Sequence, residues 1–147
     1  MMGEPDITGT DILGDGDRVV LTFPARGDLV VLARLVSSAI STRVGFDIEE
    51  LEDLRLAVGE LCLLALQGSD ARHGDLRLEF TVSEVSLDIS CTLAGAAPAM
   101  GSRSADGAEA DQLSEQILAA LVDEHGRVQE DGSVQAWLRK RRKGPLA

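Results

Sequence analysis

Few side chains in this 147-residue chain have the type and spacing that site chemistry requires. Cys62 and Cys91 show no CxxC spacing for zinc or redox work, and both lie in apolar segments, so we expect them in the core. His73 and His125 have no second His or Cys at ligand spacing, which indicates surface residues and no metal site. Motifs of the P-loop, HExxH and GxSxG types are also missing from the chain.

Charge gives a stronger signal than these residues do. The chain has 25 Asp and Glu against 14 Lys and Arg, a net charge of −11. Five basic residues form the run Arg139–Lys143, so residues 1–138 carry 9 − 25 = −16. Such a body repels nucleic acid, which needs a basic footprint, and it can steer a basic protein partner. The alternative is that the acidic surface only keeps the protein soluble.

Acids are densest at the start of a predicted helix. They are candidate partner-binding residues that could steer a basic protein. Alternatively, they are ordinary first-turn charges that the helix dipole favours. The five residues are Asp47, Glu49, Glu50, Glu52 and Asp53.

Hydrophobic periodicity predicts the elements that position these residues. A strand is expected at 18–23, helices at 28–44, 47–67 and 110–124, and further strands at 76–82, 85–93, 127–129 and 133–138. Helices grouped with mostly antiparallel strands predict an α/β (α+β) fold. We expect a two-layer sandwich in which helices cover one face of a mostly antiparallel, mixed sheet.

The length predicts one domain, which we place at residues 18–139. Residues 1–17 are expected to form a flexible arm and 140–147 a basic, solvated tail. Gly, Ala and Ser fill residues 94–109, where we expect a long loop. With no apolar run long enough for a membrane span and no signal-peptide pattern, we expect a cytoplasmic protein without membrane contact.

The segment at residues 51–66, LEDLRLAVGELCLLAL, resembles the signature helix of the anti-sigma regulatory factors of the serine-kinase type. That family shares the histidine-kinase-like (GHKL) ATPase fold, and its helix reads roughly DLRLAVsEaxxNA. The run Asp53–Val58 and Glu60 match this pattern. The resemblance implies that Glu60 is the general base and that 94–109 stands in place of the ATP lid. It further implies that position 64, one helical turn after Glu60 on the same face, helps to hold Mg²⁺ and nucleotide.

Ligand positions of the family are changed in this chain. Position 64 is Leu, which cannot bind a metal, so no metal site is expected. The family's Asp-x-Gly after the central strand reads Leu93-Ala94-Gly95, which keeps the Gly alone. Without its partners, Glu60 could be an ordinary solvent-facing helix residue. The remaining weak candidates for cofactor binding are Gly95, Gly107, Gly132 and Ser133.

The resemblance thus implies a divergent member with nucleotide binding weakened or lost, and with no cofactor. Our first hypothesis is an anti-sigma factor that sequesters a sigma factor by protein contact. An anti-anti-sigma antagonist of the STAS type would release the sigma factor, and the family commonly forms homodimers. The alternative is an active serine/threonine protein kinase that phosphorylates the antagonist with Mg-ATP. A third hypothesis is an α/β domain with no link to transcription.

Overall fold

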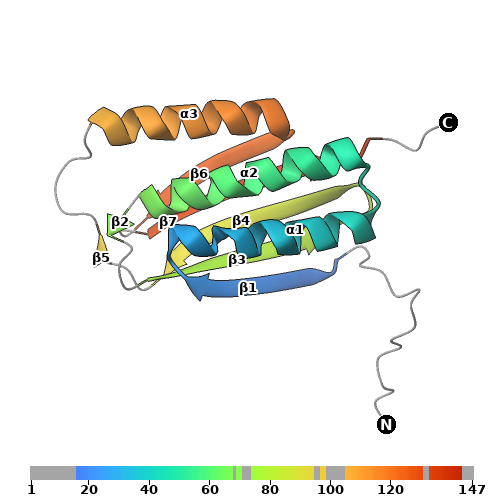
Figure 1. Ribbon diagram of the computed structural model, residues 1–147, viewed down its shortest axis with the longest axis horizontal. Helices are drawn as coiled ribbons and strands as arrows, with labels where there is room; N and C mark the ends of the chain where they lie inside the picture. The colour runs from blue at the N-terminus through green and yellow to red at the C-terminus, as the bar shows by residue number, and fades with distance from the viewer. Residues whose placement is uncertain are drawn as a thin grey trace, which may run out of the picture.

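The computed structural model describes residues 16–67, 69–70, 74–94, 97–98, 105–130 and 133–143. Its elements follow one another as in Figure 1. They are β1 (Arg18–Pro24), the 3-10 turn η1 (Gly27–Leu29), α1 (Val30–Val44), α2 (Ile48–Gln67), β2 (Ser69–Asp70), β3 (Asp75–Val82), β4 (Ser86–Ala94), β5 (Ala97–Pro98), α3 (Ala105–Leu121), β6 (Glu124–Glu130) and β7 (Ser133–Arg141).

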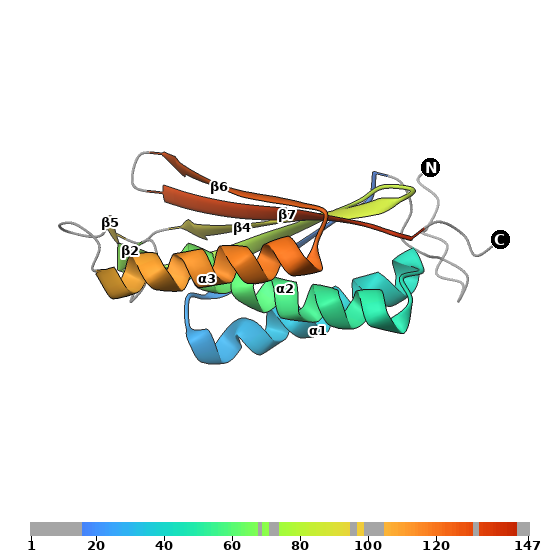
Figure 2. The same cartoon turned by 90° about the horizontal axis from the view of Figure 1, so that it is seen from above.

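The described strands build a five-stranded sheet in the order β1-β3-β4-β7-β6, and β2 pairs with β5 apart from it. Every neighbouring pair in the large sheet is antiparallel. All three α-helices lie on one face of this sheet (Figure 2). The two-layer α+β architecture expected from the sequence is therefore confirmed.

Buried and exposed side chains alternate along the strands, which explains why helices cover one face of the sheet. In β3, every second residue is buried, and Leu78 and Phe80 are fully enclosed. Leu54 and Leu61 of α2 belong to the same core. Each such side chain contributes roughly 1.5–3 kcal/mol through removal of apolar surface from water. The opposite face of each strand is richer in polar residues, and no described helix covers it.

Local residues fix the corner between the first two helices. α1 ends at Gly45, whose φ of 94° lies in the left-handed region that glycine adopts without steric cost. α2 then opens with a capping box. The Asp47 carboxylate accepts the backbone N–H of Glu50 at 2.7 Å, and the Glu50 carboxylate accepts the N–H of Asp47 at 2.9 Å. These caps explain why α1 ends and α2 begins where the sequence pattern predicts.

Several elements differ from the sequence expectation, including β6, which spans Glu124–Glu130 and so takes in the last residue of the helix expected at 110–124. α3 begins at Ala105, inside the segment expected to be a loop, and ends at Leu121. β2 and β5 were not predicted, because two-residue strands are too short to show alternation. β7 continues to Arg141, so the expected tail from residue 140 begins inside the sheet. In the sequence, a run of Lys and Arg is typical of a solvated chain end. The strand register shows that Arg139, Lys140 and Arg141 instead pair with β4.

Candidate functional site

Glu60 and position 64 lie on the side of α2 that faces α3. Lys140 of β7 contacts both helices on this side. Its Nζ donates to the Leu121 carbonyl at the end of α3 and lies 3.8 Å from the Asp53 carboxylate of α2. Asp53, Glu60 and Leu64 are spaced by seven and four residues, so they share one helix face. The signature face of α2 is therefore packed beneath α3.

Leucines occupy two of the family's ligand positions, one on this face of α2 and one near the end of β4. Leu64 is 1% exposed and Leu93 is 4% exposed, and both belong to the hydrophobic core. Asn and Asp at these positions would bring polar groups to a nucleotide, whereas the two leucines bring only packing. The substitution is therefore built into the core and is no mere surface change.

Glu60 has an unusual environment for an acidic side chain. Its side chain is partly buried, and its Oε2 atom is enclosed without a hydrogen-bond partner among the described residues. A buried carboxylate oxygen without a partner is costly. The expectation that Glu60 could be an ordinary solvent-facing residue does not fit this environment.

Two of the weak cofactor candidates lie in described elements, and two lie outside the described residues. Gly107 lies in the first turn of α3, and Ser133 is the first residue of β7. Gly95 and Gly132 fall outside the described residues. Among the residues whose side chains are described, no cluster of three or more His, Cys, Asp or Glu could hold a metal ion. The described ranges also hold no helix that is long and apolar enough to cross a bilayer.

The acidic candidates at the start of α2 divide into two groups. Glu49 and Glu52 are exposed, with 76% and 57% of their side-chain surface free. Asp47 is exposed too, and Asp53 lies beside Lys140. Glu50 is buried at 3%, so its expected role as a surface contact is wrong. Its carboxylate is held by the capping box and by the backbone N–H of Lys143 at 2.7 Å.

The basic run Arg139–Lys143 folds onto the domain. Arg139 pairs with Asp88 at 2.7 Å and with Glu124 at 3.2 Å on the outer face of the sheet. The Arg142 guanidinium donates to the last carbonyl of α1 at 3.3 Å. Lys143 places its Nζ 3.8 Å from the Glu49 carboxylate. Part of the acidic charge at the start of α2 is thus balanced within the chain.

A second surface, which sequence reasoning missed, covers the outer side of α1 and α2. The Arg34 guanidinium lies against Gly59, where a Cβ would come within 2.6 Å of Nη2. This contact makes the outer faces of the two helices continuous. Four large apolar side chains on these faces are 39–59% exposed. We call them, together with Arg34, the α1–α2 outer face: Val31, Arg34, Leu35, Leu56 and Leu63.

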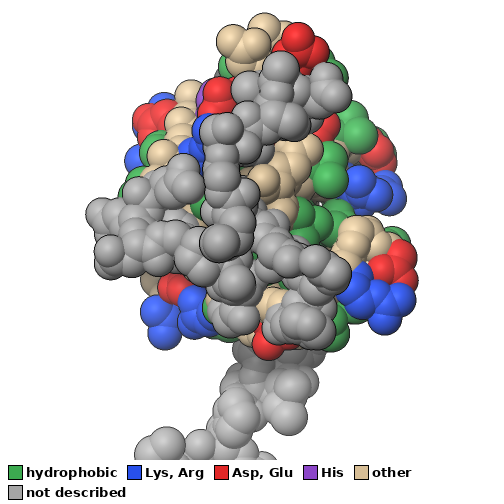
Figure 3. Space-filling view, turned by 90° about the vertical axis from the view of Figure 1, so that its left-hand side faces the viewer, with side chains coloured by type: hydrophobic (Ala, Val, Ile, Leu, Met, Phe, Trp, Pro, Cys, Tyr) green, Lys and Arg blue, Asp and Glu red, His purple; other side chains and the backbone are tan. Residues whose placement is uncertain are grey.

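The apolar residues of this face are visible in the sequence, but their pattern does not show that they are exposed. α1 has apolar residues on most of its circumference, which usually indicates a buried helix. Leu35 and Leu56 are nevertheless 59% exposed. Figure 3, which looks at the end where α1 begins, shows hydrophobic side chains at the surface between acidic and basic ones. Only the packing of the helices showed which of the apolar residues stay outside.

The cysteines behave as the sequence predicts. Cys62 and Cys91 are free and fully buried. A hydrogen bond with Cys62, together with burial, raises the pKa of the Cys91 thiol well above its usual range. His125 is half-buried on β6, and His73 lies outside the described residues.

Comparison with known proteins supports the resemblance. The chain is 36% identical over 77 residues to the serine-protein kinase RsbW of Bacillus pumilus, covering 50% of this chain and 48% of the relative. The RsbW proteins of Listeria monocytogenes serotype 4a and Bacillus subtilis match at 35% and 31%, again over 77 residues and 48% of each relative, with 50% and 51% of this chain covered. No family model matches the chain. The matched segment is thus about half the length of these relatives.

A solved structure extends the likeness to the whole domain. The RsbU and RsbW domains of Rv1364c from Mycobacterium tuberculosis match 88% of this chain and 33% of that one, with a TM-score of 0.63 and 16% identity. At this identity, the match concerns the fold alone. The histidine-kinase-like ATPase fold is confirmed, and so is the resemblance to the anti-sigma regulatory factors of the serine-kinase type.

Proposed function

We propose that this chain is an anti-sigma factor that sequesters a sigma factor by protein contact and needs no nucleotide to do so. The α1–α2 outer face carries the proposal. It places exposed apolar side chains around one guanidinium, and arginine is among the residues enriched at energetically dominant interface positions. Contiguous apolar surface of this kind marks protein interaction sites.

Arg34 is the centre of this interface in our proposal. No ion-pair partner for its guanidinium exists among the described residues, so it is available to a partner. Its contact with Gly59 holds the side chain flat on α2, which lowers the entropy lost on binding. A carboxylate on the sigma factor, flanked by apolar residues, would complement this arrangement.

The exposed acids at the start of α2 would assist the encounter. Glu49 and Glu52 lie on the same helix as Leu56, and Glu52 shares its face at a spacing of four residues. With a net charge of −11, the protein would attract basic regions of a DNA-binding partner. We assign to these acids a role in association rate and to the apolar face the role of affinity.

Loss of nucleotide use is the second part of the proposal. The support is Leu64, at 1% exposure in a core that also contains Leu93. Mg-ATP would need polar ligands where these residues pack. Release of the sigma factor would then depend on competition by an antagonist of the STAS type, as the resemblance implies, and on no phosphoryl transfer. Homodimer formation, also implied by the resemblance, is part of this proposal.

Two measurements test the two parts separately. The first is capture of sigma factors from a bacterial extract on the immobilised chain, with Arg34→Ala as the matched variant. We expect a sigma factor on the parent chain and much less on the variant, and its absence from both would overturn the anti-sigma assignment. The second is calorimetric titration with Mg-ATP and Mg-ADP. Absence of heat at millimolar nucleotide is expected, and clear binding would overturn the loss of nucleotide use.

One observation favours an active kinase as a second candidate. The enclosed, unpartnered Oε2 of Glu60 is what a general base awaiting a substrate would show. Transfer of radioactive phosphate from ATP to a co-purified antagonist, abolished by Glu60→Ala, would establish this candidate. Its absence with an antagonist that binds the chain would exclude it.

A further inference from the structure

The first strand of the large sheet, β1, is an edge strand with one open side. It pairs with β3, and no described strand pairs with its other side. The Asp17 carbonyl and the Ala25 N–H, one residue beyond either end of β1, bond toward the β3 side at 2.8 and 2.9 Å. Alternate residues of an antiparallel strand bond to the same neighbour. The residues of β1 that direct both N–H and C=O to the open side are therefore Arg18, Val20 and Thr22.

The two edges of the sheet differ in how they are protected. β6, the other edge strand, contains Glu124 and Arg127, and Arg127 points inward to Asp111 of α3 at 2.6 Å. Charged side chains on an edge strand, and inward-pointing ones in particular, prevent pairing with other chains. Between its end residues, β1 reads Val-Val-Leu-Thr-Phe and has no charge. β1 is thus the described edge that is open to a further strand.

Apolar side chains line both faces of the open edge. Val20 is 45% exposed on the outer face of the sheet, and Val19 and Leu21 are only partly buried on the helix side. α1 is the helix at this edge of the helical layer (Figure 1), and its Leu32 is 37% exposed. Leu32 lies two residues before Arg34, about 200° around the helix, so it faces away from α2. A strand added to β1 would cover apolar surface on both faces.

The distribution of charge allows a second copy of the chain to approach this edge. Two copies with a net charge of −11 repel each other, so they can meet only where acids are sparse. Residues 18–46 contain one acid, Asp28, which pairs with Arg26 at 2.7 Å. The single charged residue of β1 is Arg18, which lies 3.1 Å from Glu79.

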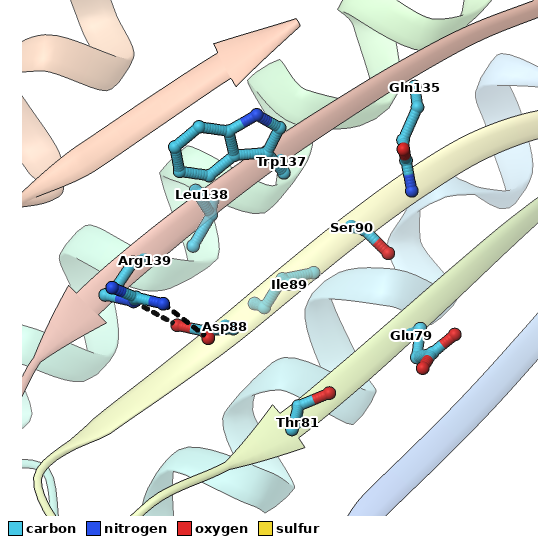
Figure 4. A pocket seen from close by; sticks show the side chains of 9 residues that line it. All are labelled: Glu79, Thr81, Asp88, Ile89, Ser90, Gln135, Trp137, Leu138 and Arg139. Carbon is cyan, nitrogen blue, oxygen red and sulfur yellow. Dashed lines mark hydrogen bonds and ion pairs between the residues drawn. The ribbon is translucent and has the colours of Figure 1, made fainter. Parts of the chain in front are cut away.

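The outer face of the sheet is a less suitable surface for a second copy. It has a hollow of about 290 Å³ over Ser90 of β4, between β3 and β7 (Figure 4). The charged side chains around this hollow already pair within the chain, namely Asp88 with Arg139 and Glu79 with Arg18 and Arg77. A partner on this face would have to compete with these pairs, whereas the open side of β1 offers backbone groups and apolar side chains.

We propose that a second copy of this chain pairs with the open side of β1, antiparallel and about a two-fold axis at Val20. In this register Val20 faces the partner's Val20, and Arg18 faces the partner's Thr22. Each residue with open N–H and C=O groups therefore meets another such residue. If the axis lay at Leu21 instead, Arg18 would face Pro24, which has no N–H to donate.

This pairing joins the two sheets into one and places the helices of both copies on the same face. Val20 packs against its counterpart on the outer face, and Val19 packs against the partner's Leu21 on the helix side. The interface is isologous, because the same residues contribute from both copies. It gives a surface to the homodimer that is part of the proposed function, and it rests on that part alone.

Two matched valine variants test the edge by sedimentation of the full chain. Val20→Lys places like charges opposite each other at the axis and should convert the dimer to a monomer. Val128→Lys makes the same change on β6, at 44% exposure, and should leave the dimer intact. Both valines are exposed, so neither variant disturbs the core. A monomeric parent chain, or a dimer that persists in Val20→Lys, would overturn the proposal.

Cross-linking tests the register. The Cα atoms of a hydrogen-bonded antiparallel pair lie about 5.5 Å apart, within the roughly 4.4–6.8 Å that a disulfide spans. Val20→Cys should therefore give a covalent dimer on oxidation with diamide. Thr22→Cys is exposed on the same face, but its two copies would lie about 13 Å apart or more and should not link. Equal linking of both variants, or none in either, would contradict the proposed pairing.

These outcomes are distinct from those of the anti-sigma assignment. A dimer that persists in Val20→Lys overturns this interface and keeps the homodimer, whereas a monomeric parent chain overturns both. Capture of a sigma factor is read from the parent chain and Arg34→Ala, on the other side of α1 from the β1 edge. The anti-sigma assignment therefore stands or fails separately.

Discussion

The guanidinium of Arg34 on α1 rests against the backbone of Gly59 on α2, so closely that a Cβ at position 59 would lie 2.6 Å from Nη2. Glycine inside a helix normally lowers stability by about 1 kcal/mol relative to alanine. Here the missing side chain leaves the space in which Arg34 crosses between the two helices. The contact therefore gives position 59 a role that helix propensity does not explain.

Gly59→Ala should separate folding from binding. We expect thermal stability to stay equal or to rise by up to about 1 kcal/mol, because the exposed Arg34 can move aside. Affinity for the sigma factor should fall by about tenfold or more, as loss of a central interface arginine does. Arg26→Ala, an exposed arginine outside this face, is the control. Unchanged affinity in both Gly59→Ala and Arg34→Ala would contradict the proposed interface.

Leu64→Asn restores the family residue but should not restore a nucleotide site. An amide placed at a 1% exposed core position loses apolar packing and is left without a partner, at a cost of roughly 2–5 kcal/mol. Leu64→Met conserves volume and should cost less than about 1.5 kcal/mol. Urea unfolding measures the cost, and Mg-ATP calorimetry on the same samples should show no gain. A stable variant that binds Mg-ATP would mean that the remaining ligands are still in place.

Glu50 and Glu49 are adjacent acids with opposite roles. Glu50→Ala removes the acceptor of two backbone N–H groups, those of Asp47 and Lys143, and should lower the free energy of unfolding by about 1–3 kcal/mol. Glu49→Ala removes one exposed contact at 3.8 Å and should change stability by less than about 0.5 kcal/mol. Chemical denaturation of both variants compares them directly. Equal effects would mean that the buried contacts contribute nothing.

Charge reversal should slow the encounter with a basic partner. The double change Glu49→Lys and Glu52→Lys should lower the association rate and weaken its dependence on salt. Asp75→Lys with Glu84→Lys changes the net charge equally at exposed positions on β3 and in the β3–β4 turn. Stopped-flow kinetics at several salt concentrations distinguish a local patch from net charge. If both pairs slow association equally, the start of α2 has no special role.

Thiol chemistry should report on the core. Both cysteines are fully buried, and the pKa of Cys91 is raised, so a thiol reagent should label neither until the chain unfolds. The ordinary pKa of this thiol is 9.0. Because the folded-state pKa lies above it, the unfolded chain ionises first, and stability is intact below about pH 9 and falls as pH rises further. Cys91→Ala should remove this alkaline loss, and rapid labelling of the native chain would contradict the packing.

Sequence pattern alone predicted the helices and strands with strong periodicity or clear caps. Gly45 ends α1, and Asp47 with Glu50 opens α2, through bonds between residues close in the chain. Strand alternation likewise placed Leu78 and Phe80 inside. The motif around Glu60 predicted the fold family, because it is a local run of residues on one helix. These features depend on residues that are close together in the chain, so the sequence pattern was sufficient to predict them.

Tertiary structure decided what depends on distant segments. Glu50 is buried because Lys143, 93 residues away, donates to it. Arg139–Arg141 belong to the sheet because β7 pairs with β4 and β6 at that register. Arg34 contacts Gly59 only because α1 packs beside α2. Ser90 likewise lies between Glu79 and Trp137 only because β4 pairs with β3 and β7. Burial and charge pairing are properties of three-dimensional neighbours, and a pattern along one segment does not specify which neighbours it will have.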